Sequence, residues 1–406
     1  MPKLDFSLQV ISPAFVAGAM EKQAETNLRD REGNTPKHRL IGDEGLRVPS
    51  LRGILRFWFR AKEDGSNPQA VFQKEVAIFG DTQSGQGIRM IPTGKSSWQP
   101  AQIGTTEEFV STGGAQAYLG YGPLNYVSRE QEVSSHNKSA FRDAIPEGQV
   151  FHFRAIGSTQ QLDELRKCLL LLHLFGGIGS RSRRAWGSVA VIGNFIPALN
   201  KNESIKEWFE RTLELVWPDQ SKPSQKPHLP KFSAFFANSA IRISASRGSY
   251  KEVMEEFYRQ FRATRLWRTG RQPRSTIAQN DHDWEMRDST GSDVNDVPLR
   301  LAFGMPYFPK SREHNWEIEY FGYYPNPKNP GKLEEIDRRA SPLFLKVFHG
   351  PGQKLYAVAL FLKAEFFGEK KVEIGKDQKG KKLPFSSWKA VEEFMNCADW
   401  QTISLP

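Results

Sequence analysis

The chain has 406 residues, of which 38% are hydrophobic and 25% are charged, so it is long enough for two domains and too apolar for wholesale disorder. Lys and Arg outnumber Asp and Glu by 56 to 46, and the resulting charge of +10 favours polyanionic partners such as nucleic acid or anionic membrane. The longest apolar run, 168–175, is too short to span a bilayer. Two cysteines provide neither a disulfide framework nor a zinc pattern, so we expect a cytoplasmic protein without membrane association, metal or other cofactor.

The first half begins with a strand over Leu4–Val10, where apolar and polar residues alternate. A polar, turn-rich stretch over 20–45 is expected to be a long, mobile loop. The elements expected after it are a helix over Pro49–Ala61 with Ser50 at its N-cap, a strand over Val150–Ile156, an apolar helix over Leu162–Phe175 and a strand over Ser188–Ile192. This order of strands and helices suits a ferredoxin-like βαββαβ domain, an α+β fold with helices on one face of the sheet.

A helix over Glu203–Trp217 and a linker rich in proline, lysine and serine separate the halves. We therefore divide the chain into an N-terminal domain over 1–200, the helix and linker over 201–231, and a second ferredoxin-like domain over 232–406. The elements expected there are strands over Ala240–Ala245, Leu299–Phe303, Pro342–Phe348 and Leu355–Phe366, and helices over Tyr250–Leu266 and Trp388–Met395. Two long polar insertions, 270–297 and 310–340, are expected to be either functional or mobile.

Three arginines recur at a spacing of four residues in the first expected helix. Arg52, Arg56 and Arg60 form one narrow stripe on that helix, with Gly53 beside it, where a backbone can approach closely. Like charges in a row repel one another and need carboxylates or phosphates opposite them. The free amides at a helix start near Ser50 also suit phosphate. The stripe therefore predicts either a phosphate contact or pairing with acidic side chains.

A second cationic motif follows the apolar helix, in the segment GGIGSRSRRAWGSV. Its glycines permit backbone conformations that aim consecutive amides at an oxyanion, and its arginines supply forked donors. The order helix, glycine turn, strand excludes a nucleotide P-loop, which needs a strand first and a GKS or GKT sequence. A simple glycine C-cap explains the glycines but not the density of arginines. The residues that this motif offers to an oxyanion such as a phosphate are Gly177, Gly179, Ser180, Arg181, Arg183 and Arg184.

A third basic element lies at the end of the helix expected over Tyr250–Leu266. Arginines recur every third residue around an aromatic residue that can stack on unpaired bases. The alternative is an ordinary solvated helix end followed by a loop. The additional RNA contacts that this element offers are Arg265, Trp267, Arg268 and Arg271.

Taken in combination, several segments resemble the RAMP proteins of CRISPR effector complexes, and among them subunit one of the type III-B Cmr complex. These segments are PSLRGILRFWFRA, EVAIFG, GGIGSRSRRAWGSV, LAFGMP and RRASPLFLKV. The resemblance implies two tandem ferredoxin-like, RRM-like RAMP domains and a non-catalytic, RNA-binding subunit. By the same resemblance, the chain caps the RAMP filament near the 3′ end of the guide RNA and assists capture of single-stranded target RNA, with guide RNA and other RAMP subunits as partners.

Two alternatives stay open. The first is a RAMP endoribonuclease that processes guide RNA or cleaves target RNA, using His38 or the cluster Asp281, His282 and Asp283. Neighbouring side chains in a loop need not converge, and His38 has no evident partner in the sequence. The second is a general RNA-binding protein outside CRISPR systems.

Overall fold

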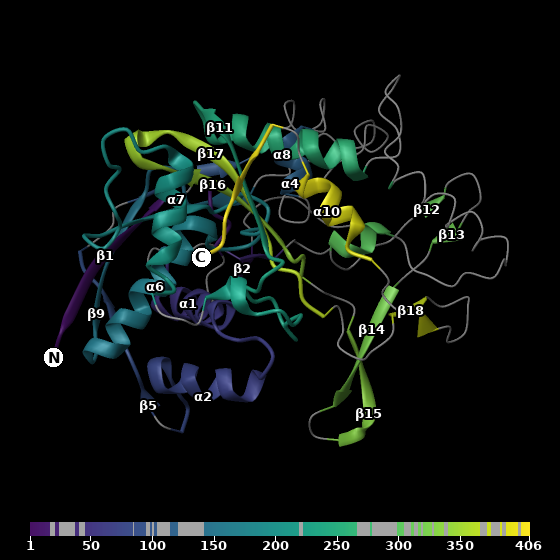
Figure 1. Cartoon of the computed structure of the whole chain (residues 1–406), viewed down its shortest axis with the longest axis horizontal. Coiled ribbons are helices and arrows are strands. Elements are labelled where there is room, and N and C mark those ends of the chain that lie inside the picture. Colours follow the sequence, from purple (N-terminus) through teal and green to yellow (C-terminus); the bar gives the residue numbers. More distant parts are fainter. Residues whose placement is uncertain are drawn as a thin grey trace.

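A computed structural model gives the fold of the chain (Figure 1). The longer described segments are 1–16, 45–83, 85–94, 142–218, 222–265, 299–303, 340–365, 387–396 and 399–406. The shorter ones are 21–23, 37–39, 98–99, 101–103, 114–120, 277, 310–311, 316–317, 320–326, 329–336, 372–374 and 382–383.

The first half forms an antiparallel sheet in the order β10-β1-β9-β6. Its strands are β1 (Lys3–Val10), β6 (Arg89–Pro92), β9 (Val150–Ile156) and β10 (Val189–Ile192). Numbered along the chain, that order is 4-1-3-2, which is the ferredoxin-like arrangement. The alternation predicted at the N-terminus is confirmed, because Leu4, Phe6 and Leu8 are buried while the residues between them are not.

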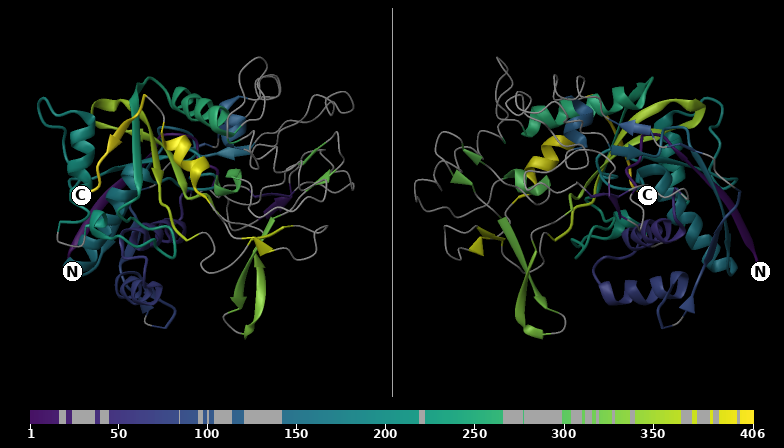
Figure 2. Two further views of the ribbon diagram at one scale, coloured as in Figure 1. Left: turned by 45° about the vertical axis from the view of Figure 1, so that its right-hand side comes forward. Right: turned by 180° about the vertical axis from the view of Figure 1, so that it is seen from behind.

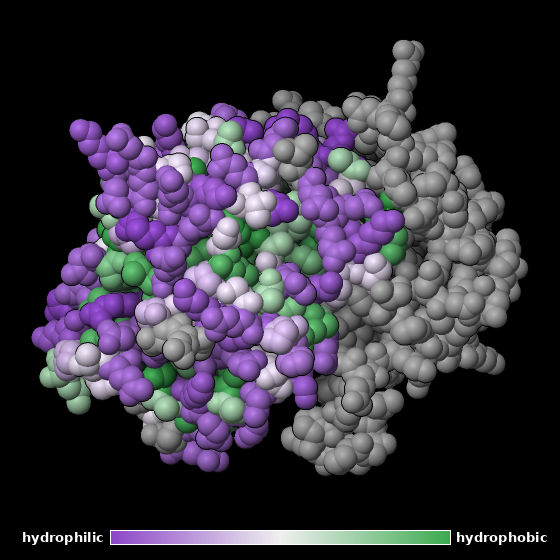
Figure 3. Space-filling model, viewed as in Figure 1, coloured by the Kyte–Doolittle hydropathy of each residue, from purple (hydrophilic) through white to green (hydrophobic). Residues whose placement is uncertain are grey.

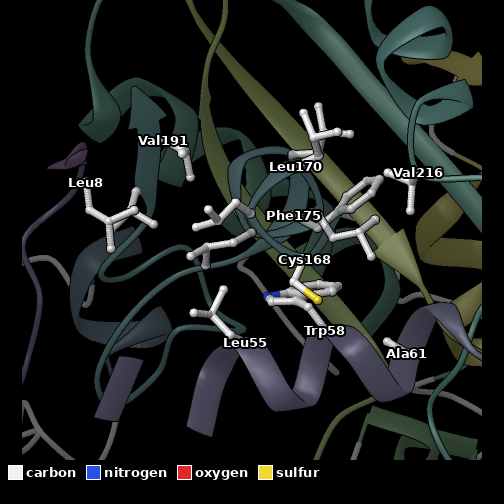
Figure 4. Packing of buried hydrophobic residues seen from close by; sticks show 14 of the residues in the cluster. Leu8, Leu55, Trp58, Ala61, Cys168, Leu170, Phe175, Val191 and Val216 are labelled. Carbon is white, nitrogen blue, oxygen red and sulfur yellow. The ribbon is translucent and has the colours of Figure 1, made fainter. Parts of the chain in front are cut away.

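Two helices cover the buried face of this sheet, α1 (Val48–Lys62) and α6 (Thr159–Phe175). A capping box starts α6: the Ser158 hydroxyl accepts from the Gln161 amide, and the Gln161 side chain accepts from the Ser158 amide. Figure 4 shows Trp58 of α1 close to Cys168 of α6 within the apolar layer between the two helices. Burial raises the pKa of the Cys168 thiol to about 12, so this cysteine is an inert core residue.

The second half repeats the arrangement. Its sheet has the order β16-β17-β11-β20, which is again 4-1-3-2 when read from β20. Its elements are β11 (Ala240–Arg247), α8 (Tyr250–Arg265), β16 (Leu343–His349), β17 (Leu355–Phe361), α10 (Lys389–Met395) and β20 (Gln401–Ile403). The predicted fold class, two tandem ferredoxin-like domains of α+β type, is therefore confirmed.

The two halves pack tightly against each other. The helix α7 (Ile205–Glu214) follows the first sheet, and its Phe209 packs on Phe175 of α6 and Phe348 of β16, with ring centroids 5.5 Å and 5.3 Å apart. One buried cluster accordingly contains side chains from both sheets. The proposed boundary at 201–231 stays a prediction, and α7 occupies the helix expected in that interval.

The remaining elements are shorter or peripheral. In the first half they are β2 (Glu21–Gln23), β3 (Lys37–Arg39), α2 (Pro68–Phe79), β4 (Gly80–Asp81), β5 (Gly85–Gln86), β7 (Ala101–Ile103), α4 (Ala115–Leu119) and β8 (Arg142–Ala144). In the second half they are η1 (Pro223–Gln225), η2 (Leu299–Phe303), β12 (Lys310–Ser311), β13 (Trp316–Glu317), β14 (Tyr320–Asn326), β15 (Asn329–Ile336), η3 (Pro351–Gln353), β18 (Val372–Ile374) and β19 (Lys382–Leu383).

Several features of the fold differ from what the sequence predicted. The strand expected over Leu299–Phe303 is wrong, because this segment is the 3₁₀ helix η2, which buries Leu301, Ala302 and Phe303. The helix α2 was not predicted. The stretch 20–45 contains the paired strands β2 and β3. The insertion 310–340 contains the hairpin β14–β15, which projects away from the two sheets in Figures 1 and 2.

Within the part of the chain that the structure describes, no helix is long and apolar enough to cross a membrane. In the view of Figure 3, the surface of the described residues is largely hydrophilic, and hydrophobic residues show between the hydrophilic ones.

Candidate nucleic-acid interface

The arginine stripe of α1 faces α2. Arg56 Nε lies 2.5 Å from one carboxylate oxygen of Glu75, and Arg60 Nη1 lies 2.8 Å from the other. The Glu75 side chain is only 4% exposed, whereas those of Arg56 and Arg60 are 25% and 42% exposed. A buried carboxylate thus bridges two partly exposed guanidinium groups, which is the acidic partner that the spacing of the arginines requires.

The same stripe also binds the end of α2. Arg52 donates to the carbonyl oxygens of Phe79 and Ile88 at 3.1 Å each, and Arg56 donates to the carbonyl of Gly80 at 2.8 Å. The last carbonyls of a helix carry partial negative charge, so cations placed there are favourable. The three arginines therefore have a structural role in fixing α2 and the turn after it. Their contact with RNA stays a prediction.

The expected N-cap at Ser50 is wrong. Helix α1 begins at Val48, its N-cap is Arg47 without a side-chain capping bond, and Pro49 occupies the first turn. Proline is well tolerated at that place because the amide it lacks has no partner within the helix. Ser50 accordingly lies inside the helix, and its role in binding RNA also stays a prediction.

Residues 176–187, which we call the glycine-arginine turn, form a closed, hairpin-like loop on the first sheet. The amide of Ile178 donates to the carbonyl of Gly187 at 2.8 Å, and the amide of Ser180 donates to the carbonyl of Phe15 at 2.8 Å. Gly179 has a φ of +75°, and a Cβ atom there would lie 2.5 Å from the Phe15 carbonyl oxygen, so only glycine fits. A Cβ at Gly177 would likewise lie 2.8 Å from the Gly187 carbonyl oxygen.

Several backbone amides of this turn donate hydrogen bonds within the protein. Those of Ser180, Arg184 and Ala185 donate to carbonyl oxygens of Phe15, Arg181 and Leu345. These three amides therefore have partners within the protein, and a cradle formed by the amides of this turn stays a prediction. Three consecutive residues of the turn are exposed: Gly179, Ser180 and Arg181. We call them the tip of the turn, and it is the part that a partner can reach.

Arg181 occupies an unusual backbone conformation at that tip. Its φ of 61° lies in the left-handed region, which costs a residue with a side chain about 1–3 kcal/mol. This conformation is stabilised by the hydrogen bond that the Arg184 amide donates to the Arg181 carbonyl at 2.7 Å. An exposed arginine kept in a strained conformation by its surroundings points to a function in binding.

Arg183 points in the other direction. Its guanidinium carbon lies 4.3 Å from the ring centroid of Phe344 and 5.2 Å from that of Phe57, and Nη1 donates to the carbonyl of Ser341 at 2.6 Å. Burial lowers the pKa of Arg183 to about 10, so the group remains protonated at neutral pH. Arg184 lies over the ring of Phe261 at 4.7 Å. Both arginines therefore contact aromatic rings of the second half, and their contact with RNA stays a prediction.

An open strip of α1 lies next to the turn. Phe57 is half-buried and contacts Arg183, while Gly53, one helical turn earlier, is exposed, and a Cβ at that position would meet nothing within 4 Å. Gly53 and Phe57 thus form a strip on α1 next to the arginine stripe, and this strip contacts the glycine-arginine turn through Phe57 and Arg183.

The other predicted residues are less informative. Arg265 ends α8, and the residues Trp267, Arg268 and Arg271 lie outside the described residues. The catalytic candidates Asp281, His282 and Asp283 also lie outside them, and the His38 backbone pairs with Lys22 in the β2–β3 pairing. Among the described residues, no cluster of three or more His, Cys, Asp or Glu side chains could hold a metal ion.

Sequence reasoning missed the residues that hold these arginines. Glu75 lies on the unpredicted helix α2, whose start is marked by Asn67 and Pro68; the Asn67 side chain accepts a hydrogen bond from the Ala70 amide. An asparagine followed by proline is a recognisable helix start and could have revealed this helix. Phe344, which lies against Arg183, is distant in sequence and carries no local signal.

Comparisons with known proteins agree with the fold. Residues 7–190 match the model of the RAMP superfamily. The crystal structure of Cmr1 from Pyrococcus furiosus, in its apo form, is similar with a TM-score of 0.53 and 17% sequence identity, over 99% of both chains. A chain in the cryo-EM structure of the type III-B Cmr-beta complex bound to cognate target RNA has a TM-score of 0.49 and 11% identity, over 97% of this chain and 99% of that one. No curated protein sequence gives a significant match.

The first half of the chain, residues 7–190, is therefore similar to the RAMP superfamily, and the 4-1-3-2 sheet of that half is repeated in the second half. The fold of the whole chain is similar to the two-domain fold of Cmr1.

Proposed function

We propose that this chain is a non-catalytic, RNA-binding subunit of a type III-B CRISPR effector complex. In this role it caps the RAMP filament near the 3′ end of the guide RNA and helps to capture single-stranded target RNA. The observation that carries the RNA-binding part is the exposed tip of the glycine-arginine turn, where Arg181 is held at a positive φ. The assignment to a Cmr complex is supported by the likeness to Cmr1 over the whole chain.

The path proposed for RNA runs along the open strip of α1 and over the tip of the turn. Gly53 allows the RNA backbone to approach the helix closely, because no side chain stands there. Arg181 supplies a phosphate contact on one side. Arg56 and Arg60 lie on the other side with guanidinium groups that Glu75 neutralises only in part, since one carboxylate faces two cations. Such contacts to phosphate carry little sequence information, which suits a subunit that handles many guides.

Two experiments test this function. Tagged chain expressed with the other Cmr subunits should recover them together with guide RNA, and its recovery with RNA alone would favour a general RNA-binding protein. The purified chain should bind labelled single-stranded RNA without cutting it. Cutting that is lost in His38→Ala or Asp283→Ala would establish the endoribonuclease instead.

A further inference from the structure

Strand β16 of the second sheet pairs with the glycine-arginine turn of the first half. The amide of Leu345 donates to the carbonyl of Arg183 at 3.1 Å, and the amide of Ala185 donates to the carbonyl of Leu345 at 2.9 Å. Arg184 and Leu345 thereby form a parallel β-bridge. Residues 183–185 thus act as a short extra strand on the edge of the second sheet, and they follow the tip that carries Arg181 by only two residues.

The side chain of the next residue of β16 is buried among residues of the first half. Lys346 is 1% exposed, and its ammonium group donates to the carbonyl oxygens of Leu172 at 2.7 Å, Gly176 at 2.8 Å and Val189 at 2.7 Å. Leu172 and Gly176 belong to the last turn and the C-cap of α6, where the helix dipole favours a cation. Burial lowers the pKa of Lys346, while the three carbonyls use all three N–H groups of its protonated form.

The alternation of side chains along β16 explains how one strand serves both halves. Phe344, Lys346 and Phe348 point toward the first half, while Leu343, Leu345 and Val347 pack in the core of the second. Phe344 contacts Arg183 just after the tip of the turn, and Lys346 binds the end of the helix just before it. Both ends of the turn are therefore fixed by a single strand that is distant in sequence.

We propose that Lys346, Phe344 and Arg183 are positioning residues, through which the second sheet fixes the shape of the glycine-arginine turn so that Arg181 can meet RNA. This inference rests on the proposed function for its RNA step. It assigns the second half a part in RNA capture that needs no RNA contact of its own. It also changes the expected role of Arg183, which holds the turn and does not touch phosphate.

This role has a measurable signature. If a substitution leaves the turn paired with β16 in only a fraction of the molecules, which we call the docked fraction, the apparent dissociation constant for RNA rises by the inverse of that fraction. The number of phosphates contacted by a docked molecule stays the same, so the salt dependence of binding keeps its slope. Loss of a direct phosphate contact, by contrast, lowers the slope.

The test compares Lys346→Met, Arg183→Met and the control Lys363→Met, which removes a surface lysine paired with Glu392. Methionine keeps most of the packing volume and removes the charge and its hydrogen bonds. The first readout needs no RNA: amide hydrogen exchange at Ala185 and Leu345, the two amides that join the turn to β16. The second is binding of a labelled single-stranded RNA of mixed sequence over a range of salt concentrations.

Exchange at the two amides should rise about ten-fold in Lys346→Met and Arg183→Met, and remain unchanged in Lys363→Met. RNA binding should weaken about five-fold with an unchanged salt slope. Unchanged exchange in a folded Arg183→Met protein overturns the inference, as does a lowered salt slope. If Lys346→Met does not fold, the exchange and binding results of Arg183→Met alone decide whether the second sheet fixes the turn. Absence of RNA binding by the unaltered chain would refute the proposed function, while the exchange result would still decide whether β16 holds the turn.

Discussion

Oε1 of Glu75 lies 2.5 Å from Nε of Arg56, so this almost fully buried carboxylate joins the two helices α1 and α2. Oε2 of the same carboxylate lies 2.8 Å from Nη1 of Arg60. These contacts show that one role of the arginines is to hold α2. The second role, which we propose, is to present charge to RNA.

Glu75→Gln tests the first role. The substitution keeps the shape of the side chain but removes the charge, so we expect the free energy of unfolding to fall by about 1.5–3 kcal/mol, the range for hydrogen bonds to charged groups. Chemical denaturation measures the change, and Glu214→Gln, at an exposed position of α7, is the matched control. An unaltered midpoint in Glu75→Gln would contradict the structural role of the stripe.

Arg56→Ala should act mainly on stability for the same reason. It removes the contacts to Glu75 and to the carbonyl of Gly80 together, so we expect a loss of about 1–3 kcal/mol. RNA affinity, measured where the variant is fully folded, should fall by less than in a variant of Arg181. The opposite ranking would mean that the stripe, and not the turn, is the main contact.

Gly53 offers a probe of the RNA path that does not disturb the fold. Since nothing lies within 4 Å of a Cβ at this position, Gly53→Ala should stabilise the protein by up to about 1 kcal/mol through helix propensity. Gly53→Glu should be tolerated equally by the fold, but it places a negative charge on the path and should weaken RNA binding markedly. Equal RNA affinity of the two variants would show that RNA does not lie on this strip.

His173 makes the stability depend on pH. Burial, together with the charge of Lys346 and the neighbouring His349, holds the pKa of His173 well below its usual value of 6.5. Its Nδ1 accepts from the amide of Val191 at 3.0 Å, which requires that nitrogen to be unprotonated. Below pH 6.5 the unfolded chain binds a proton that the folded chain does not, so stability is full above that pH and falls as pH decreases.

From pH 7.5 to 5.5 we expect the titration of His173 in the unfolded chain to lower the free energy of unfolding by roughly 1–2 kcal/mol. Carboxylates with lowered pKa, such as Glu203 beside Arg211, act only at lower pH. His173→Asn keeps an acceptor near the Val191 amide and cannot titrate, so its stability should vary less over this interval. A pH dependence equal to that of the unaltered chain would exclude His173 as the source.

Local patterns were sufficient to predict most of the fold. The alternation over Leu4–Val10 and the apolar helix ending at Phe175 identified β1 and α6, because in both elements one short-range period decides which side chains are buried. The order of these elements then led to the ferredoxin-like class. The segment Leu299–Phe303 was misassigned because a short apolar run does not distinguish a strand from a helical turn packed on α10.

The candidate site was harder to predict. The density of arginines and glycines located the turn, but the direction of each side chain depends on contacts from far along the chain. Arg181 and Arg183 are two residues apart, yet one is exposed and the other lies against Phe344, about 160 residues away by the numbering. Such a difference is decided by tertiary packing, and composition does not contain it.

The most direct test of RNA binding at the turn is the salt dependence of single-stranded RNA affinity for the unaltered chain, Arg181→Lys and Arg181→Gly. Glycine relieves the backbone strain at φ 61°, so Arg181→Gly removes the charge without weakening the turn. We predict that Arg181→Gly binds more weakly and that its plot of log affinity against log salt is shallower by about 0.7, the contribution of one phosphate, while Arg181→Lys keeps the slope. Identical affinity and slope in all three proteins would contradict the account.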